Sequence, residues 1–552
     1  MDPPAAREKV ELTSANIVAG GVGEEPTKEK GPVAVVAGGL REEELQPPSV
    51  KDVVTRKELW AYYAYYIGNS GLSLFNFAPT QFQNLLQLAG HNLGDPTTPC
   101  DDSVPCVLPF AGNPERNVAS IVLICNGISF ALQVVLFLVI GSLADFGRWR
   151  PWILIGFTAL SVGISIGWLG VEEASKWEVA TGLYIVGLIA YQGSLTFWTS
   201  AFPQLARNLP EMQESQARLI SGETTPEKHN QLDSLSRNRI ANMAFAVCSC
   251  GEVVVLAILV GILFALNSDA STESNTKALS VVCAYAGAVW MVCAMPHFIL
   301  EKHRPGRKLP EGSSYWTIGF KVLWKALIKI RKLTDTCLYL AMFFLMSDVL
   351  NTTVTVISTL QYSVLSFNTL QLTYLLIVGI VAQAAGILLF WYIQKNWRFS
   401  TRTMFIVVCV GIILLTIWGM IGCWTTRFGF HNEWEFWFYQ AFYGLVVCPW
   451  YSYSQTMISE VIPVGTEFLM FALFGSVGKT SAFIGPFVTS AISARTNNTS
   501  SAFYFLFALG IVSCTILPFI NIERSHRQCA RFLEEEAREL YTEAERVKAE
   551  RL

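Results

Sequence analysis

Charged residues are scarce in this sequence of 552 residues: only 15% are Asp, Glu, Lys or Arg, against roughly a quarter in ordinary soluble domains. Apolar residue types make up 52% of the chain. This composition excludes a soluble enzyme and indicates a chain that lies mostly in a membrane. The net charge of −3 offers no basic surface for nucleic acid, so nucleic-acid binding is excluded as well.

Motifs of known enzyme chemistry are also missing. The sequence has no HExxH and no glycine-rich phosphate loop ending in Lys, and its six His residues are scattered without Cys at metal-ligand spacing. We therefore expect no enzymatic activity, no cofactor and no metal site. The absence of a nucleotide-binding domain excludes an ATP-driven pump, which leaves transport driven by a gradient or facilitated diffusion.

The 13 cysteines are too scattered for a disulfide scaffold, and most lie in apolar runs where a thiol is simply a small hydrophobic group. Cys100 and Cys106 are the exception, because they lie in a polar loop between residues 95 and 116. Their spacing is short enough to close a small ring if the loop faces an oxidising compartment. The sequence is compatible with a disulfide and with two free thiols, and we predict the disulfide.

Runs of roughly 20 predominantly apolar residues, the length that crosses the hydrocarbon core of a bilayer, occur twelve times. The sequence thus predicts an all-α integral membrane protein with twelve transmembrane helices. The predicted spans are 59–78, 119–140, 151–170, 179–202, 240–265, 279–300, 335–358, 371–394, 402–424, 434–457, 467–491 and 501–521.

The distribution of Lys and Arg predicts the orientation of the chain. An even number of spans puts both termini on one side, and the loops after even-numbered spans hold most of the loop Lys and Arg, so both termini are expected to be cytosolic. Two glycosylation sequons, at Asn497 and Asn498, fall in the loop between spans 11 and 12, on the opposite side. We expect a glycoprotein modified there.

The basic loop between spans 6 and 7 divides the chain into two six-helix bundles. Its lysines 321, 325, 329 and 332 recur at helical spacing beside apolar residues, which favours an interfacial helix on anionic lipid over a plain solvated linker. The predicted parts are a disordered cytosolic tail (1–57), an N-terminal bundle (58–300), the basic linker with its interfacial helix (301–334), a C-terminal bundle (335–522) and a charged helical tail (523–552).

A motif directly after span 2 carries a family resemblance. Gly141, Asp145, Gly147, Arg148 and Arg150 resemble the loop signature of the major facilitator superfamily. Small residues allow helices to approach closely, Asp145 is able to cap a neighbouring helix N-terminus, and the basic residues hold the cytosolic rim. A chance turn is the weaker alternative, because the motif follows the second span of a chain with six plus six spans. The matching loop after span 8 lacks the aspartate.

A narrower resemblance is spread over residues 58 to 521. The segments 60–65, 98–109 and 202–206, together with Glu467, Phe471, Gly478, Lys479 and Gly485-Pro486 in span 11, are similar to the fungal autophagy-related vacuolar amino-acid effluxers. This resemblance implies a multi-pass protein of the vacuolar membrane that returns neutral amino acids to the cytosol after autophagic breakdown.

Three ionisable residues mark a predicted central site. Glu252 in span 5, Asp348 in span 7 and Lys479 in span 11 each lie thirteen residues from the cytosolic start of their span, about 20 Å along a helix. They share a depth near the midplane, where transporters with two related halves bind substrate. Lys479 would hold the carboxylate of a zwitterion, and Glu252 or Asp348 its ammonium group or a coupling proton. The alternative is that Lys479 only clamps helices together by pairing with one carboxylate.

Further polar residues in spans 1, 4, 7 and 10 are candidates for lining the same cavity, although helix-packing hydrogen bonds explain each one alone. These candidates are Asn69, Gln192, Asn351, Tyr451 and Gln455.

The sequence therefore predicts a major facilitator fold that works by alternating access and exports amino acids from a vacuole, with the lipid bilayer and a small solute as its partners. One alternative is a carrier of sugars, peptides or drugs in the plasma membrane. Another is a non-transporting sensor or scaffold. The buried midplane charges favour a carrier, because a scaffold has no need of them.

Overall fold

The structure is a computed structural model. It describes residues 35–36, 40–41, 53–100, 106–145, 149–266, 272–304, 330–364, 369–481, 484–496 and 498–550. Several predicted features lie outside the described residues. They are most of the tail 1–57, the predicted interfacial helix, Gly147, Arg148, Asn497 and the side chain of Lys479.

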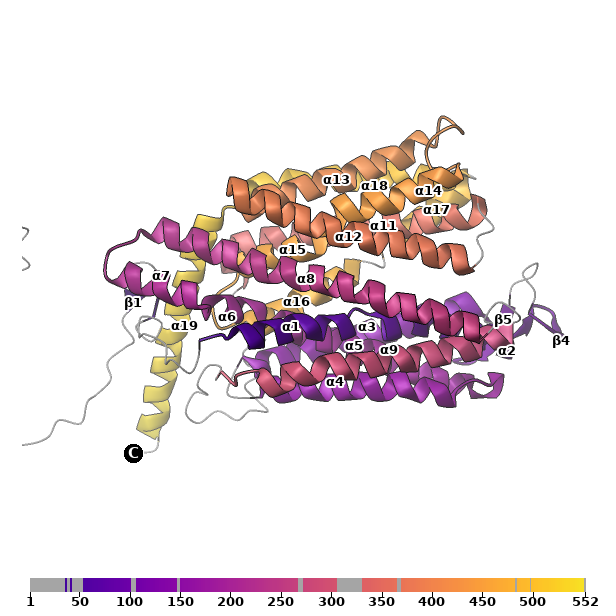
Figure 1. The fold of residues 1–552 in the computed structure, drawn as a ribbon, viewed down its shortest axis with the longest axis horizontal. Coiled ribbons are helices and arrows are strands. Elements are labelled where there is room, and N and C mark those ends of the chain that lie inside the picture. Colours follow the sequence, from indigo (N-terminus) through magenta and orange to yellow (C-terminus); the bar gives the residue numbers. More distant parts are fainter. Residues whose placement is uncertain are drawn as a thin grey trace, which may run out of the picture.

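Within these residues, nine helices are long and apolar enough to cross a membrane. They run side by side along the long axis of the molecule (Figure 1). Their bounds are α3 (Val118–Ala144), α4 (Arg150–Gly167), α5 (Trp177–Thr199), α8 (Pro226–Ala265), α9 (Thr272–Leu300), α11 (Thr334–Val364), α12 (Thr369–Trp397), α13 (Thr401–Ile421) and α18 (Ala502–Ile516).

Three further apolar segments are described in more than one helical piece. The first consists of α1 (Arg56–Gly68), a π-helical stretch η1 (Leu72–Phe77) and α2 (Ala78–Ala89), and it extends well beyond the predicted span 59–78. Between α1 and η1, Gly71 adopts a φ of +97°, a conformation that glycine adopts readily. The second consists of α14 (Glu433–Phe442), η5 (Tyr443–Val447) and α15 (Pro449–Val461). The third consists of α16 (Glu467–Ser481) and α17 (Ile484–Thr496), on either side of residues 482–483, which lie outside the described residues.

A small antiparallel sheet at one end of the bundle departs from the all-helical expectation. Its strands β3 (His91–Asn92), β4 (Asp95–Pro99), β5 (Cys106–Phe110) and β6 (Asn113–Asn117) pair in the order β4-β3-β5-β6. A two-residue hairpin with positive φ at Ala111 and Gly112 joins β5 to β6. The structure joins Cys100 and Cys106 in a disulfide beside this sheet.

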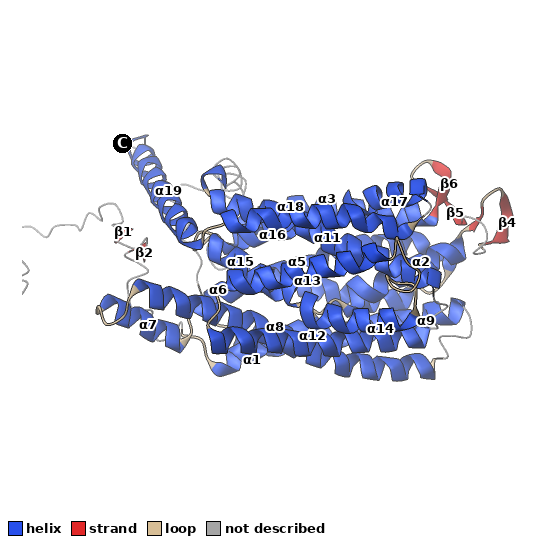
Figure 2. Cartoon of the chain, turned by 90° about the horizontal axis from the view of Figure 1, so that it is seen from above, coloured by secondary structure: helices blue, strands red, loops and turns tan. Residues whose placement is uncertain are grey.

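The opposite end, which we call the α19 end, carries α6 (Phe202–Arg207), α7 (Pro210–Ile220) and the long α19 (Ile522–Glu550), as Figures 1 and 2 show. The tail predicted to be without structure contributes a short strand pair there, β1 (Val35–Val36) with β2 (Leu40–Arg41). Helix α1 starts at the same end, since the N–H of Val54 donates to Asn208 O over 2.9 Å. Helix α1 therefore begins at the end of the molecule where α19 lies.

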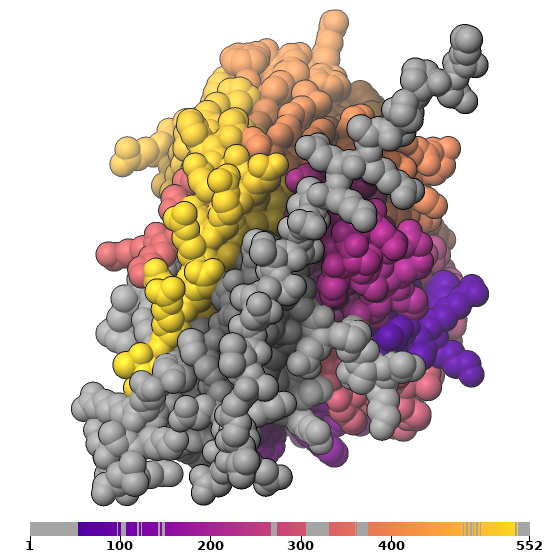
Figure 3. Space-filling view, turned by 90° about the vertical axis from the view of Figure 1, so that its left-hand side faces the viewer, coloured from indigo at the N-terminus to yellow at the C-terminus, as the bar shows by residue number. Residues whose placement is uncertain are grey.

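Helix α19 lies across this end (Figure 3) and is fixed to the second half of the chain. Arg524 donates two hydrogen bonds of 2.7 Å to the buried carboxylate of Asp335, at the start of α11. Three apolar residues of α19 pack on Leu333: Cys529, Phe532 and Leu533. The predicted charged tail is thus a helix whose first part is docked on the bundle.

The two halves of the chain meet along two seams. Helix α3 packs against α16, and α8 packs against α12 and α15. In Figure 1 most of α1 to α9 lie on one side and most of α11 to α18 on the other, with α16 drawn between α8 and α1, so any site between the halves is built from both.

Candidate functional site

Asp145 joins the two halves at the α19 end. It is buried at the end of α3, and its two carboxylate oxygens accept the backbone N–H groups of Phe468 and Leu469, each over 3.1 Å. These N–H groups belong to the first turn of α16, where no partner exists within the helix and the helix dipole favours a negative charge. Gly141 makes the approach possible, because a Cβ there would lie 3.0 Å from Phe468 O. The motif residues Gly141 and Asp145 therefore act at the α3–α16 seam.

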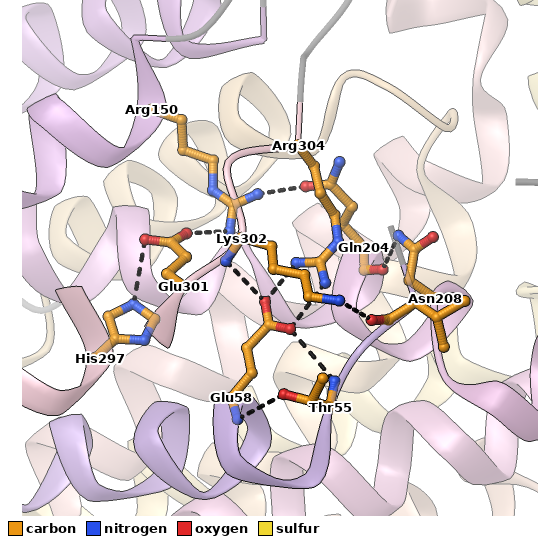
Figure 4. A network of polar contacts seen from close by, with 10 residues as sticks. Thr55, Glu58, Arg150, Gln204, Asn208, His297, Glu301, Lys302 and Arg304 are labelled. Atoms are coloured by element: carbon orange, nitrogen blue, oxygen red, sulfur yellow. Dashed lines mark hydrogen bonds and ion pairs between the residues drawn. The ribbon is translucent and has the colours of Figure 1, made fainter. Parts of the chain in front are cut away.

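Arg150, the last residue of the motif, starts a polar network inside the first half (Figure 4). Its guanidinium donates to Glu301 over 3.0 Å and to Gln204 of α6, and it also stands 5.3 Å from the centre of the Phe468 ring. Glu301 is 3.7 Å from the ring of His297 in α9. Arg150 thus links the ends of α4, α6 and α9 to the first turn of α16.

A buried ion pair continues this network to α1. Glu58 is 1% exposed and accepts two hydrogen bonds from Arg304, of 2.7 and 3.0 Å. Its neighbour Lys302 donates from Nζ to Val53 O over 2.7 Å. Sequence reasoning missed this pair, although the spacing of Thr55 and Glu58 carries the signal of the capping box found here.

Two further clusters join the halves at the α19 end, and the sequence predicted neither as a site. Arg207 of α6 pairs with Glu467 of α16 over 2.5 Å. At the second seam, Arg237 of α8 donates to the backbone carbonyl of Ser459 at the end of α15. Beside it, Glu460 accepts hydrogen bonds of 2.5 and 2.7 Å from two hydroxyl groups, one from each half: Ser234 and Thr401.

All these contacts between the halves lie at the α19 end, on the helix ends of α3, α6, α8, α15 and α16. They include charge-assisted hydrogen bonds, which are stronger than neutral ones. Opening this end would break them. The structure is therefore held closed at the α19 end, and the contacts together form what we call the α19-end gate.

Glu252 of α8 lies deeper in the bundle and is 8% exposed. Within the part of the chain that the structure describes, its carboxylate has no hydrogen-bond or ion-pair partner. Its neighbourhood includes Tyr66 and Tyr191 of the first half and Cys448 of the second. A buried, unpaired carboxylate is costly unless a proton or a cation neutralises it. Glu252 is thus a buried acid without a partner among the described residues.

Asp348 of α11 has a different environment, although the sequence placed it at the same depth. Its Oδ1 accepts the backbone N–H of Gly485 over 2.9 Å and the hydroxyl of Thr352 over 3.2 Å. Gly485 is the second residue of α17. The structure gives Asp348 a backbone N–H donor from another helix, whereas Glu252 has no such partner among the described residues.

The cavity-lining candidates are distributed over both halves. Asn69 is fully buried at the end of α1, with its Oδ1 accepting from Ser194 over 3.3 Å. Asn351 donates to Ser347 of its own helix over 3.3 Å, and Gln192 and Gln455 are half-buried.

Tyr451 of α15 is 39% exposed and lies in the neighbourhood of Tyr191 of α5. Its hydroxyl lies 3.1 Å from that of Tyr443. Tyr451, Tyr191 and Glu252 therefore belong to one region between the two halves.

Comparison with known proteins identifies the family. The family model described as "Vacuole effluxer Atg22 like" matches residues 54–530. The chain belongs to this family. The match covers both helical groups and the α19-end gate, so the resemblance seen in the sequence is confirmed, and the chain is a multi-pass integral membrane protein of a vacuole effluxer family.

Curated members of the Atg22-like family align over most of the chain. Autophagy-related protein 22 of Pyricularia oryzae is 24% identical over 538 residues, covering 85% of this chain and 77% of the relative. The protein of the same name from Saccharomyces cerevisiae is 21% identical over 522 residues, covering 88% of this chain and 94% of its own length.

Solved structures show the fold. The proton:xylose symporter XylE aligns with a TM-score of 0.56 at 11% identity, over 84% of this chain and 95% of its own. FucP in the outward conformation aligns with a TM-score of 0.54 at 13% identity, over 85% and 99%. This Atg22-like chain thus has the fold of major facilitator superfamily transporters, and fold and family together make it a secondary transporter.

Proposed function

We propose that this protein exports neutral amino acids from the vacuole to the cytosol by alternating access, with Glu252 as the residue that takes up a coupling proton or the substrate ammonium group. The observation that carries the proposal is the state of Glu252, which is buried between the halves without a hydrogen-bond partner among the described residues. An acid in this state has a large free energy to gain from a proton or a cation.

The proposed topology has twelve spans with both termini in the cytosol. The nine apolar helices and the three segments described in several pieces would together supply twelve crossings, and the α19 end would be cytosolic by the positive-inside rule. The α19-end gate then closes the cytosolic side, so a substrate in the lumen is the one this conformation would accept.

The substrate class follows from the charges proposed for the site. A neutral amino acid is a zwitterion, so it needs an anionic partner for its ammonium group and a cationic or hydrogen-bond donor partner for its carboxylate. Glu252 would be the anionic partner of the ammonium group, and Lys479 would be the cationic partner of the carboxylate. A sugar would leave both charges without a partner, which costs affinity because buried charges are stable only when paired.

Uptake of labelled amino acids by proteoliposomes, with and without a pH gradient, tests the proposal. We expect counterflow of neutral amino acids that Glu252→Gln reduces by about ten- to a hundredfold, the value of a charge-assisted hydrogen bond. The matched control is Glu273→Gln, because Glu273 pairs on the helix surface with Lys277 and its side chain is 70% exposed. Unchanged flux in Glu252→Gln would contradict the role of Glu252. Counterflow of sugars alone would contradict the substrate class.

A further inference from the structure

Helix α8 contacts the second half through a row of polar side chains. At the α19 end, Asn238 Nδ2 donates to the Thr401 hydroxyl over 2.7 Å. One turn deeper, Asn242 Oδ1 accepts from the Ser452 hydroxyl of α15 over 2.9 Å. All four side chains are buried. Directed bonds between side chains therefore continue inward along this seam from the α19-end gate.

The deepest bond of this row joins Ser249 of α8 to Gln383 of α12, two helices that lie side by side (Figure 1). Gln383 Nε2 donates to Ser249 Oγ over 2.8 Å, and Ser249 Oγ donates to Phe245 O of its own helix over 3.0 Å. Ser249 is fully buried and lies about 10 Å beyond Asn242 along α8. It comes less than one helical turn before Glu252. The bond is therefore close to the depth of the proposed site.

Each partner of this bond is held within its own half. Next to Ser249, the thiol of Cys248 donates to Tyr66 O of α1 over 3.3 Å. On the other side, α12 packs so closely on η5 that a Cβ on Gly444 would lie 2.6 Å from the backbone N of Gln383. The bond thus joins one fixed point of the first half to one fixed point of the second.

Beyond Ser249, α8 meets α12 through apolar side chains. Val255, Leu256 and Leu259 of α8 belong to one buried cluster with Ile380 of α12. Apolar packing has no preferred direction, so it tolerates a small tilt between two helices, whereas hydrogen bonds weaken steeply as their angles depart from linearity. The bond made by Ser249 therefore lies between an apolar contact that tolerates tilting and a row of bonds that the opening of the gate would break.

A rigid tilt displaces each contact in proportion to its distance from the axis. Asn238 is about 16 Å from Ser249 along α8, so its bond to the second half lengthens far more for a given angle. An axis through the bond of Ser249 and Gln383 displaces that bond least. It also avoids leaving two buried polar groups without partners, which is costly where water is absent.

We propose that the hydrogen bond between Ser249 and Gln383 is the pivot of the α8–α12 seam. It persists while the halves tilt, and the bonds of Asn238 and Asn242 break and form at a distance from it. Ser249 and Gln383 are positioning residues, which keep α8 and α12 in register beside Glu252. The inference rests on the proposed function, because it assigns to this pair the fixed point of alternating access.

Covalent cross-links separate a pivot from an ordinary contact. The test pair is Ser249→Cys with Gln383→Cys, and the matched pair is Asn242→Cys with Ser452→Cys, each joined by the same short bis-methanethiosulfonate reagent. At the pivot, the link replaces the lost hydrogen bond, so counterflow should stay equal or rise, by up to about tenfold. At residues 242 and 452, the link holds the gate closed. Counterflow should there fall by about tenfold or more and return when a reductant cleaves the link.

Counterflow, the initial rate of cross-linking and melting temperature are measured on the full-length protein. The four single-cysteine variants, treated with the same reagent, control for the cysteines already present. A reversible fall in counterflow when residues 249 and 383 are linked would overturn the pivot. Undiminished counterflow with residues 242 and 452 linked would overturn it as well.

A measurement without substrate keeps the pivot separate from the proposed function. If the parent protein moves no amino acid, the proposed function fails, and the pivot is judged by cross-linking in an Asp145→Asn background, where the α19-end gate is weakened. The rate of linking residues 242 and 452 should then fall, while the rate for residues 249 and 383 stays within about twofold. Equal falls at both pairs would overturn the pivot.

Discussion

The backbone N–H of Phe468 donates to Asp145 Oδ1 over 3.1 Å, although the two residues are 323 positions apart in the chain. Asp145 lies at the end of α3 in the first half, and Phe468 lies in the first turn of α16 in the second half. The bond exists only while the halves are in contact at the α19 end. The free energy of this contact is therefore part of the difference between the closed and open states of the gate.

Asp145→Asn should slow transport without weakening substrate binding. The amide keeps one acceptor oxygen but loses the second acceptor and the negative charge that the helix dipole favours. A change of ~1.4 kcal/mol in the free-energy difference between the closed and open states of the gate alters the ratio of their populations tenfold. Initial rates of counterflow against substrate concentration should show a lower maximal rate with an unchanged KM. An unchanged rate would show that the gate does not depend on this charge.

Arg207 and Glu467 should show coupled effects across the same seam. Each single reversal, Arg207→Glu or Glu467→Arg, leaves two like charges in contact and should reduce transport, whereas the double reversal should recover part of it. The Arg218 and Glu214 pair is the control, because both of its side chains are more than half exposed and such surface pairs contribute little. Additive effects of the two reversals would argue against a direct partnership in the gate.

Cys100 and Cys106 should resist alkylation in the folded protein unless a reductant is added. The structure bonds them beside the sheet β3 to β6, and a Cβ on Gly90, at the end of α2, would lie within 3.0 Å of both sulfurs. Peptide mapping under non-reducing conditions should recover the cross-linked peptide. Recovery of two singly alkylated cysteines from the native protein would contradict the bond.

Lys479→Met should weaken the binding of a zwitterionic substrate by about ten- to a hundredfold while the protein stays folded, since methionine keeps the apolar stem and removes the ammonium group. Substrate binding and melting temperature are measured for Lys479→Met alone and together with Glu252→Gln or Asp348→Asn. If Lys479 only clamps helices, neutralising its partner carboxylate in one of the double variants restores stability and transport together. That recovery would falsify direct contact with the substrate.

Docking of α19 should weaken as the pH falls. His526 is exposed on α19, but the protein around it partly desolvates the imidazole and lowers its pKa; nearby Arg237 lowers it further, against smaller opposing effects of Asp233, the Glu460 carbonyl and Glu523. The folded pKa then lies below the unfolded value of about 6.5. The stability that neutral His526 contributes is fully present when the pH is above the unfolded pKa. It is lost as the pH falls from the unfolded pKa toward the folded pKa.

Hydrogen exchange of residues 522–535 between about pH 5.5 and 7.5, which brackets the ordinary pKa of His, measures this effect. Exchange should be faster at the acid end after correction for intrinsic rates. His526→Gln should remove this extra pH dependence, whereas His431→Gln in the loop before α14 should not. Exchange of α19 that is independent of pH in the parent protein would contradict the role of His526.

Much of this architecture was determined by local sequence alone. A membrane-crossing segment must satisfy its own backbone hydrogen bonds and expose apolar side chains, so each span is visible as an apolar run without knowledge of its neighbours. The motif around Gly141 and Asp145 is likewise local, because a small residue and an acid at fixed spacing suffice to predict a close helix contact and a cap. The sheet β3 to β6 was missed because its strands are short, and they pair within a polar loop that has no hydrophobic periodicity.

Only the tertiary structure decided which side chains meet. Glu252 and Asp348 are both acids at the same predicted depth, and nothing in their sequence neighbourhoods separates them. Asp348 accepts the backbone N–H of Gly485, which lies 137 positions away, whereas Glu252 lies between the halves without a partner among the described residues. Arg207 and Glu467, 260 positions apart, became a pair in the same way. Hydrophobicity is a property of each segment, but the partner of a buried charge depends on which helix ends approach it, and that is fixed only when the whole bundle is packed.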